Sequence, residues 1–287
     1  MKTTRRSLVA AAAAASVAAG CAGSPRRAST PPETARTFVL IPGTWHGGWV
    51  WEPVARQLRQ RGHQAYTVTC TGVGERQHLM SPDVGLATHI EDVANVLRFE
   101  NLSDVVLVAH SFGGITLTGV ADAMPERVEQ LIFFDAFIPT RDRPAWVLRD
   151  ADGAWPAWWQ KRQERFVDGY QMAFHEEYPI EMLFDPATFP ELVPFVSERL
   201  TTHPARQWTE PVSFANGGWE SFPRSYVHCA GQKVRASSEA MWAPARGPGW
   251  QFVDAQLPRL GMLTHPTETS DLLIRLADQS GAAKPGA

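Results

Sequence analysis

The chain has 287 residues, of which 44% are hydrophobic and 20% charged, and its formal net charge is −3 at pH 7. This length is sufficient for one large α/β domain or two small ones, and its mildly acidic balance is not typical of nucleic-acid-binding proteins. The three cysteines have no metal-like spacing, so the sequence gives no indication of a metal site. The sequence favours free thiols at Cys70 and Cys229 over a disulfide between them, but it does not settle which of the two states is present.

The first twenty residues predict an export signal. Lys2, Arg5 and Arg6 precede an Ala/Val-rich stretch that is too short for a good membrane span. The arginine pair resembles a twin-arginine signal, and residues 18–21, AAGC, resemble a lipobox in which Cys21 would be lipidated. An ordinary cleaved signal with a chance cysteine is the alternative. We therefore expect an exported periplasmic or cell-envelope lipoprotein, attached to the membrane only through a lipid at Cys21 if the lipobox is used.

Residues 21–35 predict a flexible tether, because they are rich in Pro, Ser and Ala and have no periodicity. After the tether, strand and helix patterns alternate. Apolar runs predict strands over residues 36–41, 63–69, 104–109 and 128–139, and helical spacing predicts helices over 51–62, 87–98 and 112–124. This alternation is typical of a mostly parallel sheet with helices on both faces.

The pattern changes at about residue 140. Residues 141–222 are rich in Pro, Trp and acidic residues, which favours an inserted helical cap over more sheet. The strand and helix pattern resumes afterwards, with strands over 224–230 and 250–255 and helices near 237–244 and 266–277. We expect one α/β domain over residues 36–280 and a disordered tail over 281–287.

The segment VVLVAHSFGGITL at residues 105–117 predicts a nucleophile elbow, in which a strand turns sharply into a helix around a serine. Ala109 and Gly113 are the small flanking residues that such a turn requires, although glycine is commoner at the first of these positions. The turn would place Ser111 Oγ above the carboxyl edge of the sheet, where ligands bind in open α/β folds. A serine in an ordinary Gly-rich loop is the alternative.

Acyl transfer to Ser111 also needs hydrogen-bond donors for an oxyanion. One donor is expected to be the backbone N–H of Phe112, and the other that of Thr44 in the Gly-rich loop IPGTWHGGW. His46 in the same loop is interpreted as a structural residue rather than a catalytic one.

These segments resemble the α/β-hydrolase superfamily, and more narrowly the bacterial relatives of the plant methylesterase and hydroxynitrile lyase branch. The likeness is carried by FVLIPGTWHGGWVWEPV, GHQAYTVTCTGVGER, THIEDV, LVAHSFGG and LIFFDAFIP, and covers roughly residues 37–278. It implies hydrolysis of a small, largely apolar carboxylic ester without a cofactor. It also implies a pocket under the cap, for which four tryptophans are candidate lining residues, although cap packing is favoured for each one singly: Trp146, Trp155, Trp158 and Trp159.

The same resemblance predicts a non-standard or incomplete triad. Gln232 stands where the family has its acid, and Arg259 stands where it has its histidine. A serine needs a base to take its proton, and arginine stays protonated, so it cannot be that base. Lyase activity is also disfavoured, because Leu260 replaces the lysine that the lyases place after their histidine.

Three interpretations remain open. The base and acid could be relocated to His265 and Asp135, or hydrolysis could be lost while the fold is kept. An alignment error around Asp254 is the third, but the absence of histidine between His228 and His265 means that it cannot restore the base. We predict an exported serine hydrolase acting on a small-molecule ester, and the alternative is a non-hydrolytic ligand-binding protein or pseudoenzyme on the same fold.

Overall fold

The computed structural model describes residues 35–175, 178–231 and 239–281. The predicted export signal, the lipobox at Cys21, most of the tether, nearly all of the predicted tail and Gln232 therefore lie outside the described residues. Within the described part of the chain, no helix is both long enough and apolar enough to cross a membrane.

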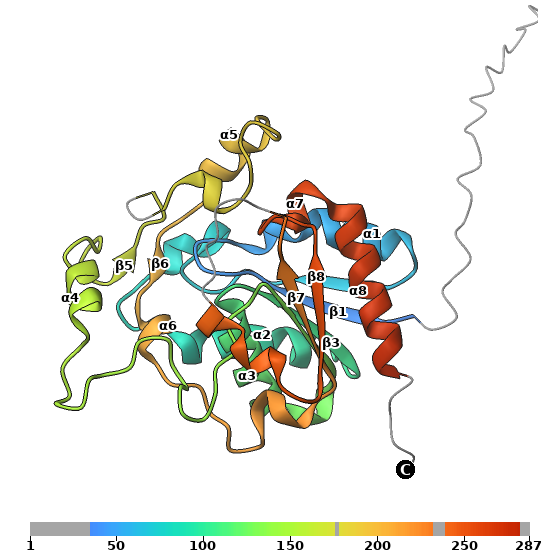
Figure 1. Cartoon of the computed structure of the whole chain (residues 1–287), viewed down its shortest axis with the longest axis horizontal. Helices are drawn as coiled ribbons and strands as arrows, with labels where there is room; N and C mark the ends of the chain where they lie inside the picture. Colours follow the sequence, from blue (N-terminus) through green and yellow to red (C-terminus); the bar gives the residue numbers. More distant parts are fainter. Residues whose placement is uncertain (1–34, 176–177, 232–238, 282–287) are drawn as a thin grey trace, which may run out of the picture.

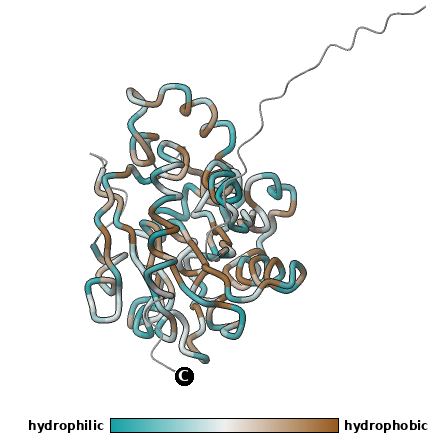
Figure 2. The backbone as a smooth tube through the Cα atoms, turned by 90° about the vertical axis from the view of Figure 1, so that its right-hand side faces the viewer, coloured by the Kyte–Doolittle hydropathy of each residue, from teal (hydrophilic) through white to brown (hydrophobic). Residues whose placement is uncertain are grey.

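Six parallel strands form the central sheet, in the order β2-β1-β3-β4-β7-β8 (Figure 1). Their bounds are β1 (Thr37–Ile41), β2 (Gln64–Thr67), β3 (Val105–His110), β4 (Val128–Phe134), β7 (Arg224–Cys229) and β8 (Trp250–Ala255). Every residue of β3 is buried, as expected for a central strand covered on both faces. Figure 2 shows this concentration of hydrophobic residues along the interior of the molecule.

Two helix pairs cover the sheet, and the predicted fold class is thereby confirmed. Helix α1 (Glu52–Gln60) packs against α8 (Pro266–Gly281) on one face, and α2 (Leu86–Phe99) packs against α3 (Gly113–Ala123) on the other. Helix α2 buries Leu86, Val93 and Leu97, which recur at helical spacing. The pattern of the sequence therefore sets which side of each helix faces the sheet.

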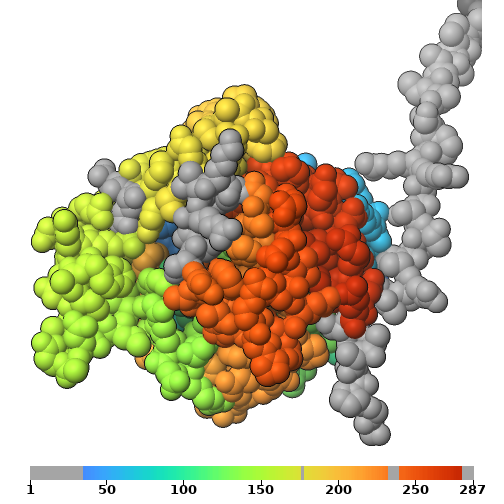
Figure 3. Space-filling view, in the orientation of Figure 1, coloured from blue at the N-terminus to red at the C-terminus, as the bar shows by residue number. Residues whose placement is uncertain are grey.

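The cap segment consists of short helices and one small antiparallel pair of strands that the sequence did not predict. Its elements are α4 (Ala157–Gln163), β5 (Gln171–Met172), α5 (Leu192–Ser197), β6 (His203–Pro204) and α6 (Arg206–Thr209). In Figure 3 these residues, coloured from yellow-green to yellow-orange, form the left and upper parts of the visible face. The cap thus lies over one side of the domain.

Two other boundaries differ from the sequence expectation. Strand β4 ends at Phe134 rather than at residue 139, because Asp135 has a φ of 43° and turns the chain out of the sheet. The helix predicted near residues 237–244 is replaced, in its described part, by the 3₁₀ turns η6 (Glu239–Met241) and η7 (Ala243–Arg246). Cys70 and Cys229 are both free and buried, as favoured from the sequence.

The remaining short elements lie in the connections between strands and helices and within the cap. They are η1 (Gly48–Val50), η2 (Gly74–Leu79), η3 (Pro125–Arg127), η4 (Ile180–Met182), η5 (Gly218–Ser221) and α7 (Gly261–Thr264).

Candidate active site

Ser111 lies on a sharp turn between β3 and α3, at the carboxyl edge of the sheet. Its φ of 52° is a left-handed conformation that side-chain-bearing residues rarely adopt. The turn is crowded: a Cβ at Gly113 would lie 2.5 Å from the carbonyl oxygen of Pro42, and one at Gly43 would lie 2.6 Å from Ser111 Cβ. The small residues around Ser111 are therefore required by close backbone approach, as in the elbow that the sequence predicts.

The two predicted oxyanion donors lie beside Ser111. Thr44 and Phe112 both line the cavity that holds the serine. Neither of their backbone N–H groups donates a hydrogen bond to any residue that the structure describes. Buried backbone donors are nearly always paired, so two such groups at one cavity can bind an acceptor there.

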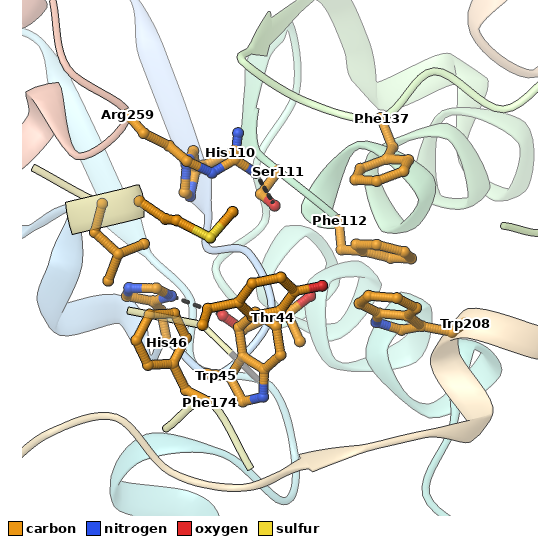
Figure 4. Close-up of a pocket in the computed structure, with 13 residues that line it drawn as sticks. Thr44, Trp45, His46, His110, Ser111, Phe112, Phe137, Phe174, Trp208 and Arg259 are labelled. Atoms are coloured by element: carbon orange, nitrogen blue, oxygen red, sulfur yellow. Dashed lines mark hydrogen bonds between the residues drawn. The ribbon is translucent and has the colours of Figure 1, made fainter. Parts of the chain in front are cut away.

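Arg259 occupies the position next to Ser111 where the resemblance places a histidine. Its Nη2 donates to Ser111 Oγ at 2.6 Å (Figure 4). Its Nη1 donates to a carboxylate oxygen of Asp135. Arg259 is 5% exposed and Asp135 1% exposed, so this ion pair is removed from solvent. Among the described residues, Arg259 is the only hydrogen-bond partner of the Ser111 hydroxyl.

The structure places the two relocated candidates differently. Asp135 directly follows β4 and reaches the site through Arg259, so the predicted acid position is next to the serine but pairs with a guanidinium instead of an imidazole. His265 is not brought to Ser111. Its Nδ1 lies 2.8 Å from Thr264 Oγ1, its ring packs edge-on against Phe189, and it is not among the residues that line the cavity. The expectation of a base at His265 is corrected accordingly, because the end of α7 directs this side chain toward the cap.

The cavity around Ser111 has a volume of about 60 Å³ and mainly aromatic walls. Phe112 stacks on Trp208 with ring centroids 4.1 Å apart, and both lie on the side of Ser111 opposite Arg259 (Figure 4). Besides Ser111, Arg259, Phe112 and Trp208, the cavity is lined by Thr44, Trp45, His46, His110, Phe137, Phe174, Tyr178, Met182 and Leu183.

None of the four tryptophans suggested for the pocket lines it. Trp146 packs behind the wall, edge-on to Phe137 with ring centroids 4.3 Å apart, and Trp159 stacks on Trp208 from outside at 5.9 Å. Trp158 is exposed. The residues that the sequence did not identify, Trp208 and Trp45, form the wall instead.

Two uncharged histidines also line the cavity. His46 Nδ1 lies 2.7 Å from the Thr44 carbonyl oxygen, which can only accept, so Nδ1 carries the proton of the neutral ring. Burial lowers the pKa of His46 to about 4. Burial and the charge of Arg259 hold the pKa of His110 well below its ordinary value. Neither imidazole is hydrogen-bonded to Ser111, which agrees with the structural role expected for His46.

Within residues 35–175, 178–231 and 239–281, no group of three or more His, Cys, Asp or Glu side chains could hold a metal ion. The chemistry that the residues at the cavity can perform is acyl transfer at Ser111, with backbone donors for the oxyanion and a guanidinium beside the nucleophile.

The chain is similar in sequence to known esterases and in fold to a known alpha/beta-hydrolase. The chain is 32% identical to a carbendazim hydrolyzing esterase of Nocardioides sp. (strain SG-4G), with 83% of this chain and 98% of that protein covered. It is 24% identical to methylesterase 2 of Arabidopsis thaliana, with 84% and 95% covered. The structure also superposes on an extracellular alpha/beta-hydrolase from a Paenibacillus species with a TM-score of 0.69 at 23% identity, and 84% of this chain and 98% of that chain are covered. That hydrolase is described as sharing structural and functional homology with tobacco salicylic acid binding protein 2.

The family model of the alpha/beta hydrolases matches residues 38–272, which include all of the sheet except Thr37, the elbow and the cap. The chain belongs to the alpha/beta hydrolase family.

Proposed function

We propose that this protein hydrolyses a small, largely apolar carboxylic ester and that Ser111 is its nucleophile. The observation that carries the proposal is the geometry of the elbow: a strained, buried serine lines an aromatic cavity together with Thr44 and Phe112, whose backbone N–H groups have no hydrogen-bond partner among the described residues. The names of the relatives, a carbendazim hydrolyzing esterase and a methylesterase, support the same reaction class.

In the proposed reaction, Ser111 Oγ attacks the ester carbonyl carbon and the carbonyl oxygen becomes an oxyanion. The N–H groups of Thr44 and Phe112 donate to this oxyanion and stabilise it where its charge develops. The oxyanion collapses, the bond from the carbonyl carbon to the alcohol oxygen breaks, and the departing alkoxide takes a proton from water. Water then hydrolyses the acyl-enzyme to release the acid and restore Ser111. Small, largely apolar esters suit this role, because the cavity next to the serine is small, about 60 Å³, and its walls are mainly aromatic.

The proposed triad is non-standard. The Arg259 guanidinium donates to Ser111 Oγ, so its positive charge favours the alkoxide form of the serine. Asp135 fixes the guanidinium from the other side. Because Arg259 cannot accept a proton, the Ser111 proton leaves to solvent hydroxide, and the rate of acylation is expected to rise with pH.

One observation favours a second candidate, the binding of a small apolar ligand without turnover. A donor, Arg259, contacts Ser111 Oγ where a hydrolase of this family is expected to have a base. The pocket and the oxyanion donors would then retain a ligand, and the serine would be unreactive.

A paired assay distinguishes the two candidates. Purified protein is tested against p-nitrophenyl acetate and butyrate, and is labelled with a fluorophosphonate, alongside the Ser111→Ala variant. Turnover and labelling that disappear in Ser111→Ala are expected for the hydrolase. Wild-type turnover no greater than that of Ser111→Ala, together with no labelling, would reject hydrolysis and leave ligand binding.

We also propose that the protein is exported and held at the cell envelope by a lipid on Cys21. The support is the sequence pattern of the first twenty-one residues, with its arginine pair and its cysteine after small residues. In cell fractionation, the full chain is expected with membranes, Cys21→Ala in the soluble exported fraction, and the Arg5→Lys, Arg6→Lys pair in the cytoplasm. A wild-type chain found in the cytoplasm would contradict the proposal.

A further inference from the structure

The residue after the oxyanion donor Thr44 is in a strained conformation. Trp45 has a φ of 68°, which is the left-handed region that a bulky side chain rarely occupies. Such a conformation persists only where surrounding contacts hold it. The Trp45 N–H shares its peptide group with the Thr44 carbonyl, so whatever holds Trp45 restricts the Thr44 backbone and with it the direction of the Thr44 N–H.

Three hydrogen bonds hold Trp45, and all of them come from the cap. Its backbone N–H donates to His203 Nδ1 at 3.3 Å, and its indole Nε1–H donates to the Met172 carbonyl at 3.0 Å. Its carbonyl accepts from the Thr201 N–H at 3.2 Å. Met172 and His203 pair with each other in the small β5-β6 sheet, so these anchors form one unit.

His203 is itself fixed in one protonation and one orientation. A backbone N–H can only donate, so Nδ1 must be the unprotonated acceptor and Nε2 carries the proton. Nε2 donates to the Gln207 side-chain oxygen, and the Gln207 amide donates to Thr116 Oγ1 at 3.1 Å. Burial holds the pKa of His203 well below its ordinary value, which keeps the ring neutral.

This chain of contacts connects the two halves of the candidate oxyanion hole. One end is Trp45, next to the donor Thr44, and the other is Thr116 on α3, the helix that begins just after the donor Phe112. His203 is 2% exposed and Gln207 3% exposed, so the connection is shielded from water. The side chain that joins both ends belongs to the cap, 158 residues along the chain from Trp45.

We infer that His203 is a positioning residue for ester hydrolysis: it holds Trp45 in its left-handed conformation and thereby aims the Thr44 N–H at the oxyanion. The inference rests on the proposed function. The cap therefore contributes to catalysis by orienting a backbone donor, in addition to covering the pocket.

The test compares two substitutions of similar size. His203→Asn keeps an acceptor oxygen near the position of Nδ1, whereas His203→Leu removes the acceptor. Losing an oxyanion donor costs about 10²–10³-fold in kcat, and a misplaced group costs up to about 10²-fold. We expect His203→Leu to lower kcat by about tenfold to a hundredfold with KM changed less than threefold, and His203→Asn to retain kcat within about threefold.

His63 offers a matched control at the opposite end of the sheet. It is also buried, and its Nδ1 accepts the Arg36 backbone N–H at 3.2 Å just before β1. His63→Leu removes the same kind of hydrogen bond and is expected to lower stability without changing kcat. If His203→Leu does not fold, His203→Gln replaces it, because its longer side chain places the amide near Nε2 and again leaves the Trp45 N–H without its acceptor.

Hydrogen exchange of the Trp45 amide gives a second readout that does not depend on turnover. We expect protection in the wild type and in His203→Asn, and faster exchange in His203→Leu. If the wild type is active and a folded His203→Leu or His203→Gln variant keeps the wild-type kcat, the inference is overturned and the proposed function remains intact. No ester turnover by the wild type would instead reject the proposed function, and the inference with it.

Discussion

Replacing Arg259 by methionine removes one partner of a buried ion pair and leaves the other in place. The Asp135 side chain is 1% exposed, and its second carboxylate oxygen has no hydrogen-bond partner among the described residues. The buried carboxylate would therefore lose the hydrogen bond that Arg259 donates to it, without gaining water. Breaking a buried pair in this way costs about 3–5 kcal/mol, and we expect a loss of that size in the free energy of unfolding at pH 7.

The double variant Arg259→Met, Asp135→Asn separates the charge effect from the packing effect. It removes the buried charge, so most of the stability lost in Arg259→Met is expected to return, since replacing both partners of a buried pair is often nearly neutral. Urea unfolding followed by Trp fluorescence measures all the variants in this cycle. An Arg259→Met protein within 1 kcal/mol of wild type, or a double variant no more stable than Arg259→Met, would refute the reasoning.

Three further outcomes are expected. Arg259→His places an imidazole between Ser111 and Asp135, so kcat/KM for p-nitrophenyl acetate should rise by about 10²-fold or more, and the pH profile should gain an acid limb near pH 6.5. If kcat/KM does not rise, Asp135 does not serve as the acid that orients a histidine base. Gly113→Ala puts a methyl group 2.5 Å from the Pro42 carbonyl oxygen and should lower both the melting temperature and Ser111 labelling; unchanged labelling would show that the turn tolerates it. The pKa of His46 is lowered from 6.5 to about 4 in the folded state, so the unfolded chain takes up a proton first as the pH falls. The free energy of unfolding that this group contributes is complete above pH 6.5 and should decrease by about 3 kcal/mol toward pH 4. Equal urea midpoints at pH 7 and pH 4.5 would contradict this expectation.

Local patterns were sufficient to predict most of the sheet and the elbow. The elbow depends on residues within a few positions of Ser111, and Gly113 is visible in the sequence because close backbone approach at the turn leaves no room for a side chain. Strand β4 was predicted five residues too long, because the apolar run continues past Asp135 and only the backbone turn at that residue ends the strand.

Contacts between distant segments could not be predicted in the same way. The sequence showed that Arg259 replaces a histidine, but not that its two nitrogens reach Ser111 and Asp135, which are 148 and 124 residues away. His203 carried no motif at all, and its contact with Trp45 depends on how the cap folds onto the first loop. His265 is a candidate base only because of its position in the chain, and the direction of its side chain is set by the turn after α7.

We propose that Ser111 is a nucleophile and that the charge of Arg259 activates it in place of a histidine base. The measurement that tests it most directly is the rate of Ser111 phosphonylation by a fluorophosphonate between pH 5.5 and pH 9. Labelling is expected to be confined to Ser111, and its rate is expected to rise continuously with pH across this range. A plateau above pH 7 with an apparent pKa near 6.5, or no labelling of Ser111 at any pH, would contradict it.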